Sequence, residues 1–157
     1  MSVEFSEKAL EQFRELLGRY PDRQAAVIPA LHLAQQEFGY ITQEVEDYVA
    51  GLLQIPPTDV HQVFTFYTMF RDRPVGKYHI KVCESVACHI MGATNVLDYL
   101  RKKLGIDVGQ TTPDGRFTLT TVECLGACEM APMMQVNDDF YGPLDEKKLD
   151  EILESLE

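Results

Sequence analysis

The cysteines constrain this sequence more than any other residue type, because they occur as two close pairs. Four residues separate Cys83 from Cys88, three separate Cys124 from Cys128, and 35 lie between the pairs. Four cysteines in 157 residues are too few for a disulfide scaffold. We therefore expect reduced thiols that hold a metal or act in redox chemistry, and the cysteines are the first place to look for function.

The first half of the chain has the periodicity of helices. Apolar residues recur at helical spacing over 6–17, over 27–38 with Gly39 as the stop, and from Thr42, a candidate N-cap, to Leu53. Thr58 is a candidate cap of a fourth, short helix. The pattern predicts a helical domain.

The period of the apolar pattern changes from about 3.6 to 2 after the polar stretch 71–76, so we place a domain boundary there. Beyond it we expect a strand at 78–82 that leads into Cys83 and a strand at 117–122 that leads to Cys124. A hairpin about residues 137–139, a helix over 92–104 and a C-terminal helix over 145–156 complete the pattern. The predicted fold class is α+β, with domains 1–75 and 76–157.

Charge and hydropathy exclude several kinds of partner. The chain has 14 Lys and Arg against 25 Asp and Glu, a formal charge of −11, which opposes binding to nucleic acid or anionic lipid. No apolar run approaches the roughly 18 residues of a membrane span, and Met1–Glu15 is amphipathic. We expect a cytoplasmic protein with no nucleic-acid partner and no segment inserted in a membrane.

The cysteine spacing leaves more than one site open. If both predicted strands end at one edge of a sheet, four thiolates could bind tetrahedral zinc or a [2Fe–2S] cluster. Zinc ribbons usually have two residues between cysteines, and the wider loops here favour the cluster, as do their small or apolar residues, which let backbone N–H groups approach sulfides. Redox-active or inert buried thiols remain as alternatives.

Other residues offer less chemistry. His89 follows a cysteine, but a Rieske site needs two histidines, so we expect it at the surface or behind the ligands. No acid and base pair stands out, so no catalytic residue is assigned. The chain also lacks a Gly-x-Gly-x-x-Gly phosphate loop, so we assign no dinucleotide-binding site to it.

Both cysteine loops resemble a known family. Val82–His89 and Val122–Met134 are similar to the cluster loops of the thioredoxin-like [2Fe–2S] subunit of NADH:quinone oxidoreductase, the E-subunit family of respiratory complex I. The resemblance extends to Leu31–Gln35, Val63–Tyr67 and Gly109–Phe117, and so covers essentially the whole chain.

The resemblance implies a helical N-terminal bundle followed by a thioredoxin-like domain with one [2Fe–2S] cluster. The positions that match the family's four ligands are Cys83, Cys88, Cys124 and Cys128. It also implies that the chain is an electron-transfer subunit in the peripheral arm of a membrane-associated complex. There the cluster accepts electrons from FMN in an adjacent NADH-oxidising subunit, and the isolated chain does not oxidise NADH. NAD-linked hydrogenases and formate dehydrogenases have an equivalent subunit, so the sequence does not decide which of these complexes contains the chain. It also does not decide whether the peptide bond before Pro132 is cis or trans.

Overall fold

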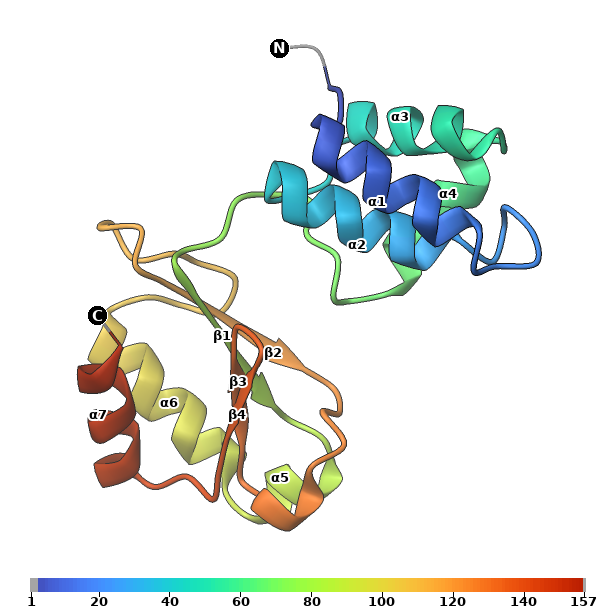
Figure 1. Cartoon of the computed structure of the whole chain (residues 1–157). Coiled ribbons are helices and arrows are strands. Elements are labelled where there is room, and N and C mark those ends of the chain that lie inside the picture. The colour runs from blue at the N-terminus through green and yellow to red at the C-terminus, as the bar shows by residue number, and fades with distance from the viewer. Residues whose placement is uncertain (1–2, 157) are drawn as a thin grey trace. The chain divides into compact units, whose positions relative to one another are not determined.

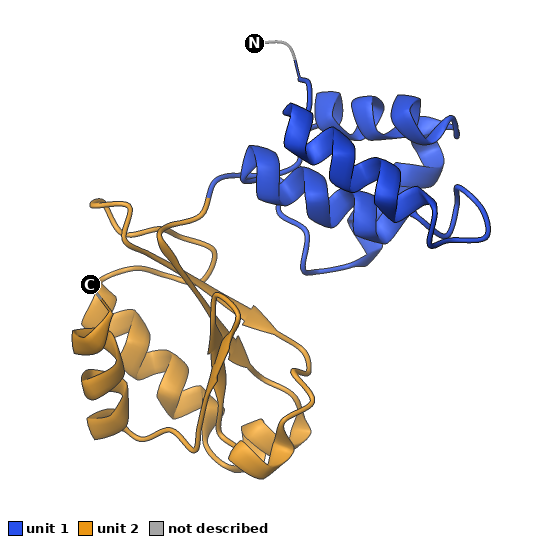
Figure 2. Cartoon of the chain, in the orientation of Figure 1, with its two compact units in different colours: residues 1–74 blue, residues 75–157 orange. Residues whose placement is uncertain are grey.

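A computed structural model describes residues 3–156 of the chain. The chain divides into two compact units, residues 1–74 and residues 75–157 (Figure 2). The first unit is helical and the second combines a sheet with helices (Figure 1), so the predicted α+β class is confirmed.

The first unit contains α1 (Glu7–Leu17), α2 (Val27–Phe38), α3 (Gln43–Leu53) and α4 (Pro57–Phe66). Side-chain hydrogen bonds cap two of these helices, and the cap at Thr42 is the one that the sequence predicts. The Ser6 hydroxyl accepts a hydrogen bond from Ala9 N–H at 3.3 Å, and the Thr42 hydroxyl accepts one from Val45 N–H at 3.4 Å. Each bond satisfies a backbone donor that the helix itself leaves without a partner.

The prediction that Thr58 caps the fourth helix is wrong. The helix begins two residues earlier than such a cap implies, at Pro57, with Pro56 in extended conformation before it and no side-chain cap. Proline suits the first helical position because its φ is already near the helical value and it has no N–H to satisfy. Pro57 therefore starts α4, whereas hydroxyl side chains cap α1 and α3.

A buried core and a hydrogen bond between two helices help to hold the first unit together. The apolar faces of the helices supply fully buried side chains, among them Val27, Leu31, Val49, Leu53 and Val60. The carboxylate of Glu46, 3% exposed, lies 2.7 Å from Nδ1 of His61 and so joins α3 to α4. Burial of each large aliphatic side chain contributes about 2 kcal/mol, so the apolar contacts together outweigh this polar one.

The second unit is built on a four-stranded sheet in the order β2-β1-β3-β4. The strands are β1 (Tyr78–Cys83), β2 (Phe117–Val122), β3 (Met134–Val136) and β4 (Asp139–Tyr141), close to the predicted ranges. β1 pairs parallel with β2 and antiparallel with β3, which pairs antiparallel with β4. In the parallel pair Cys83 lies opposite Val122, so both strands end at the same edge of the sheet.

Helices cover one face of this sheet. α6 (Ala93–Leu104) and α7 (Glu146–Ser155) lie side by side against it (Figure 1), and α5 (Val86–Ile90) is a separate short helix. The buried side chains that share this core include Ile80, Val82, Leu100, Leu119, Met134 and Leu149. Because side chains alternate along a strand, Cys83 points to the opposite face from Val82.

His79 shares the face of β1 that carries Cys83. The side chain is 8% exposed, and its Nε2 lies 2.8 Å from the Thr120 hydroxyl on β2. This hydrogen bond gives the buried imidazole a polar partner on the neighbouring strand. Within residues 3–156, no helix has the length and apolar character that a membrane span requires.

Candidate metal centre

The two cysteine loops leave the same edge of the sheet. β1 ends at Cys83 and β2 ends at Val122, two residues before Cys124. Backbone hydrogen bonds fix the first loop where it begins, from Cys83 N–H to Met133 O at 3.2 Å and from Glu84 N–H to Val122 O at 3.0 Å. The parallel pairing of β1 with β2 therefore places both predicted ligand pairs at one end of the unit.

The first pair of cysteines is buried and in contact. Cys83 is 3% exposed, and Cys88, which lies in α5, is 2% exposed. The Cys83 thiol donates to the backbone oxygen of Glu123 at 3.3 Å, which ties the first loop to the second. Burial and the contact with Cys83 raise the pKa of the Cys88 thiol above its ordinary value, while a backbone hydrogen bond with Met133 lowers it.

The second pair lies at the surface. Cys124 and Cys128 are exposed, and Cys128 begins a 3-10 turn that ends at Met130. Gly126 has a φ of +74°, a conformation that glycine adopts without strain and that reverses the chain between the two cysteines. Beneath this loop Ala127, Ala131 and Met133 pack in one apolar cluster with Cys83 and Cys88.

The structure thus brings some of the predicted ligands together more closely than others. Cys83 and Cys88 are in contact, and Cys128 is close enough for its charge to raise the pKa of Cys88. Cys124 is exposed on the other loop. Across residues 3–156, no three His, Cys, Asp or Glu side chains already stand where they could bind one metal ion.

The chemistry of the loops nevertheless fits an iron–sulfur cluster. Four thiols on two loops are the ligand set of a [2Fe–2S] centre, and hydrogen bonds to their sulfurs tune such a centre. One of these is already in place, since the Met133 backbone forms a hydrogen bond with the Cys88 sulfur. The residues between the cysteines, including Ala87, Gly126 and Ala127, have small side chains that leave the backbone accessible.

The far end of the second loop is held by a close approach that the sequence analysis missed. A Cβ on Gly142 would lie 2.2 Å from the backbone oxygen of Met130, so only glycine fits there. The Gly142-Pro143 sequence signals a turn, but it does not show which residue lies against it. The peptide bonds before Pro132 and Pro143 are both cis, which decides the alternative that the sequence left open at Pro132.

Side chains beside the cysteines divide into packed and exposed ones. Met133 and Met134 are fully buried in the core, whereas Met130 is only partly buried. His89 is exposed, as expected of a residue outside the ligand set. The carboxylates next to the cysteines, Glu84, Glu123 and Glu129, are exposed as well.

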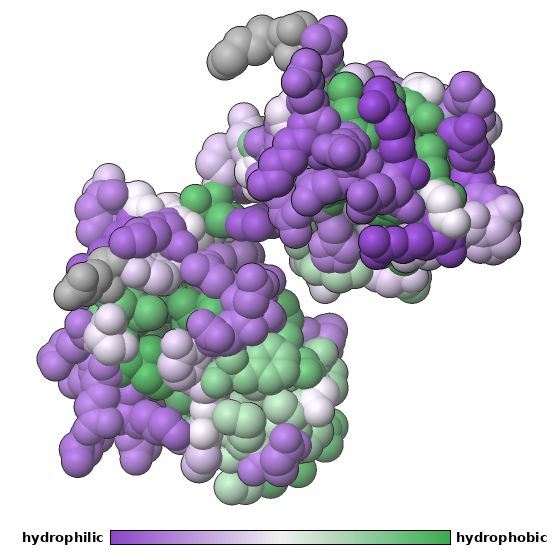
Figure 3. Space-filling view, viewed as in Figure 1, coloured by the Kyte–Doolittle hydropathy of each residue, from purple (hydrophilic) through white to green (hydrophobic). Residues whose placement is uncertain are grey.

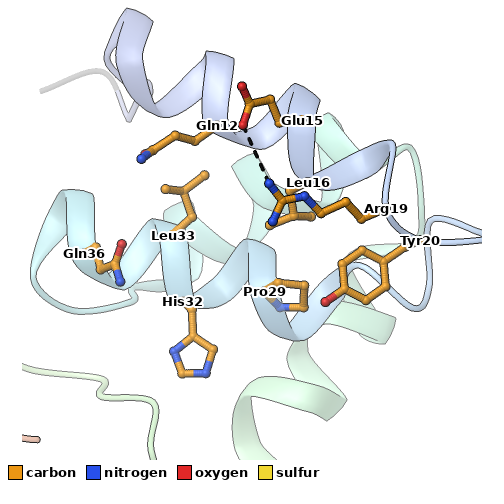
Figure 4. A pocket seen from close by; sticks show the side chains of 9 residues that line it. All are labelled: Gln12, Glu15, Leu16, Arg19, Tyr20, Pro29, His32, Leu33 and Gln36. Atoms are coloured by element: carbon orange, nitrogen blue, oxygen red, sulfur yellow. Dashed lines mark ion pairs between the residues drawn. The ribbon is translucent and has the colours of Figure 1, made fainter.

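A separate groove lies in the first unit, between α1 and α2 (Figure 4). Its lining is mixed, with Leu16, Leu33 and Pro29 beside Gln12, Gln36 and His32. The charged residues Glu15 and Arg19 lie 3.9 Å apart as an ion pair on its rim. With its charges paired and no cysteine in its lining, this groove lacks the chemistry of the cysteine loops.

Comparison with known proteins places the chain in a family. The family model described as thioredoxin-like [2Fe-2S] ferredoxin matches residues 13–157. The E 2 subunit of NADH-quinone oxidoreductase from Rhizobium meliloti (strain 1021) is 48% identical over 92% of this chain and 86% of its own length. The E subunit of NADH-quinone oxidoreductase from Rickettsia prowazekii (strain Madrid E) is 41% identical over 96% of this chain and 86% of its own length.

A solved structure supports the fold. The NAD+-reducing [NiFe]-hydrogenase in its H2-reduced state matches 83% of this chain with a TM-score of 0.70 and 24% sequence identity. The match covers 22% of the hydrogenase chain, so this protein corresponds to about a fifth of that larger chain.

Proposed function

The chain belongs to the thioredoxin-like [2Fe-2S] ferredoxin family, and from this premise we propose that it is an electron-transfer subunit of an NADH:quinone oxidoreductase. Relatives named as the E subunit of that enzyme align with nearly its full length, which supports the assignment. The enzyme activity is that of the complex, in which this chain carries one [2Fe–2S] cluster.

The ligands in this proposal are Cys83, Cys88, Cys124 and Cys128. The observation that carries it is the common edge of β1 and β2, where the buried Cys83 and Cys88 touch and the Cys83 thiol reaches the backbone of the second loop. When bound, the cluster supplies one-electron transfer. The Cys88 thiol, whose pKa is raised, must lose its proton to become a ligand, so low pH opposes ligation.

The proposed electron donor is FMN in an adjacent NADH-oxidising subunit. This chain has no Gly-x-Gly-x-x-Gly loop, so we assign NADH and flavin to that partner. We further propose that residues 1–75 and 76–157 are separate domains, of which the second holds the cluster. The complex lies on the cytoplasmic side of the membrane, with this chain in its peripheral arm.

The similarity to an NAD+-reducing hydrogenase favours one alternative, the equivalent diaphorase subunit of an NAD-linked hydrogenase. An NAD-linked formate dehydrogenase has such a subunit too. In both cases the proposed cysteine ligands stay the same, and the final acceptor or donor of the complex differs.

Cluster analysis and reduction by NADH together test the proposed function. The full chain, purified without oxygen, is expected to contain two irons and two sulfides and to absorb visible light. Alone it should neither bind FMN nor be reduced by NADH, whereas addition of the FMN-loaded NADH-oxidising subunit should let NADH bleach its spectrum. A colourless zinc protein, or tight FMN binding by the isolated chain, would contradict the proposal.

A further inference from the structure

α5 exposes large apolar side chains beside the cysteine loops. Val86 is 74% exposed, Ile90 is 77% exposed and Met91, which follows the helix, is 59% exposed. On the other side of the same turn, Cys88 is buried. Apolar surface gathers at the lower end of the second unit in Figure 3, where Figure 1 places α5.

This arrangement reverses the usual use of a surface helix. The apolar stripe of such a helix normally faces the core, but α5 turns its largest apolar side chains to solvent. Single exposed apolar residues are ordinary, whereas a contiguous group is typical of an interaction site. We call Val86, Ile90 and Met91 the α5 patch.

The surroundings of the α5 patch have one sign of charge. Residues 82–100 and 117–146, which include both cysteine loops, contain no Lys or Arg. Exposed carboxylates lie at Glu84, Glu123 and Glu129. The backbone hydrogen bond from Glu84 to Val122 brings Glu84 close to Glu123, so two of these charges lie at the same edge of the sheet.

We propose that the α5 patch and these three carboxylates form the docking surface for the flavin-bearing subunit, which meets it with an apolar centre and a rim of Lys and Arg. The inference rests on the proposed function and adds where on this chain the partner binds. A partner seated on the patch lies against the helix that carries Cys88, and therefore beside the site that receives the electron.

Charge selects this occupant over a second copy of the chain. Two identical patches in contact would bring their carboxylates together, and like charges in an interface are unfavourable. A basic rim would instead pair with Glu84, Glu123 and Glu129 and speed association. An anionic membrane surface is disfavoured for the same reason as a second copy.

Binding of variants to the purified FMN-loaded, NADH-oxidising subunit of the same organism tests the surface. We expect Ile90→Glu to weaken binding about tenfold or more, because it places a carboxylate in the apolar centre. Val108→Glu is the matched control, since Val108 is 42% exposed in the same unit but lies outside the patch, and its binding should stay within about twofold. Glu123→Lys should slow association about tenfold at low salt and less at high salt.

Each outcome separates the docking surface from the proposed function. If the wild-type chain binds the flavin-bearing subunit and Ile90→Glu, with its cluster spectrum intact, binds equally well, the docking surface is wrong and the function stands. If the wild-type chain with a full cluster neither binds that subunit nor is reduced through it, the proposed function fails too.

Hydrogen exchange in the wild-type complex gives a test that needs no variant. Addition of the flavin-bearing subunit should slow exchange in residues 84–92 and leave residues 137–139 unchanged. The hairpin is the internal control because the antiparallel pairing of β3 with β1 puts its turn at the opposite edge of the sheet. Protection of the hairpin without protection of α5 would overturn the proposal.

Discussion

The two cysteine loops begin at one edge of the sheet but differ in how folding prepares them. The first places Cys83 at the end of a strand and Cys88 in a short helix, both buried and in contact. The second leaves Cys124 and Cys128 exposed on either side of Gly126. Packing alone therefore positions one pair of proposed ligands, whereas the other depends on a turn at the surface.

This difference gives the two pairs different roles in the proposed metal site, one fixed by packing and one accessible from solvent. A buried pair of thiols costs stability unless the thiols stay protonated or gain a cation. An exposed pair costs little, and it leaves a route into the site. The first loop is therefore the fixed half of the proposed centre and the second is the accessible half.

Replacing single cysteines tests this division most strongly. We expect Cys88→Ala and Cys124→Ala each to abolish cluster binding, because each thiolate is needed and the chain has no spare cysteine. Without the cluster the variants should differ, with Cys88→Ala lowering the free energy of unfolding by about 1 kcal/mol and Cys124→Ala leaving it unchanged. Iron and sulfide analysis and urea unfolding measure the two effects.

A Cys124→Ala chain with two irons and the wild-type spectrum would remove Cys124 from the ligand set. Equal losses of stability in the two variants without the cluster would show instead that packing does not distinguish the loops.

Gly142→Ala tests how the exposed loop is held at its far end. The new Cβ would meet the Met130 backbone oxygen at 2.2 Å, so we expect the free energy of unfolding to fall by about 3 kcal/mol. Gly126→Ala is the matched control within the loop, because its Cβ meets no atom within 4 Å and only the positive φ opposes it. That variant should lose about 1 kcal/mol in the same urea titration. Equal losses of unfolding free energy in the two variants would mean that backbone conformation, rather than contact with Gly142, holds the loop.

Thiol alkylation compares the pairs directly in the chain without its cluster. At pH 8 we expect iodoacetamide to modify Cys124 and Cys128 about tenfold faster than Cys88, because Cys88 is buried and its pKa is raised. The gap should narrow as the pH rises, since the thiolate fraction of Cys88 is still increasing when that of an ordinary thiol has levelled off. Peptide mass spectrometry follows each site, and the urea-unfolded chain, in which all four should react alike, is the control.

The smallest effect concerns charge. The variants Glu84→Gln in the first loop and Glu129→Gln in the second should each raise the midpoint potential of the cluster by a few tens of millivolts. The reason is that less negative charge then opposes the arriving electron. Asp138→Asn, in the hairpin turn at the opposite edge of the sheet, should leave the potential unchanged. Redox titrations at low salt would show which loop contributes more, and a lower potential in either Gln variant would contradict the electrostatic account.

Much of the fold could be predicted because its elements are long enough to repeat a pattern. Both strands of the parallel pair span six residues with alternating apolar positions, and their ranges agree with the prediction. α5 was missed because a five-residue helix offers barely more than one turn of periodicity. Thr58 was assigned to a cap because hydroxyl residues usually occupy that position, but here prolines begin the helix.

Burial was harder to predict than secondary structure. The aromatic residues in the run at 63–70 differ sharply in burial, with Phe70 8% exposed and Phe66 78% exposed. Which ring turns inward depends on where α4 ends, at Phe66, and on the loop that follows. The cysteine spacing predicted the proposed ligands, but nothing in it indicated that one pair would be buried and the other exposed.

The position of β1 inside the sheet has a consequence for the time at which the centre can form. β1 lies between β2 and β3, so Cys83 reaches its final surroundings only after the ribosome has made Val136. At the usual rate of synthesis those roughly 50 additional residues take several seconds, during which both early thiols are on an unfinished chain. Cluster delivery therefore has to wait until β3 has been synthesised and paired, and a substitution that slows pairing of the β3 strand would reduce the yield of loaded protein even where it leaves the finished centre unchanged.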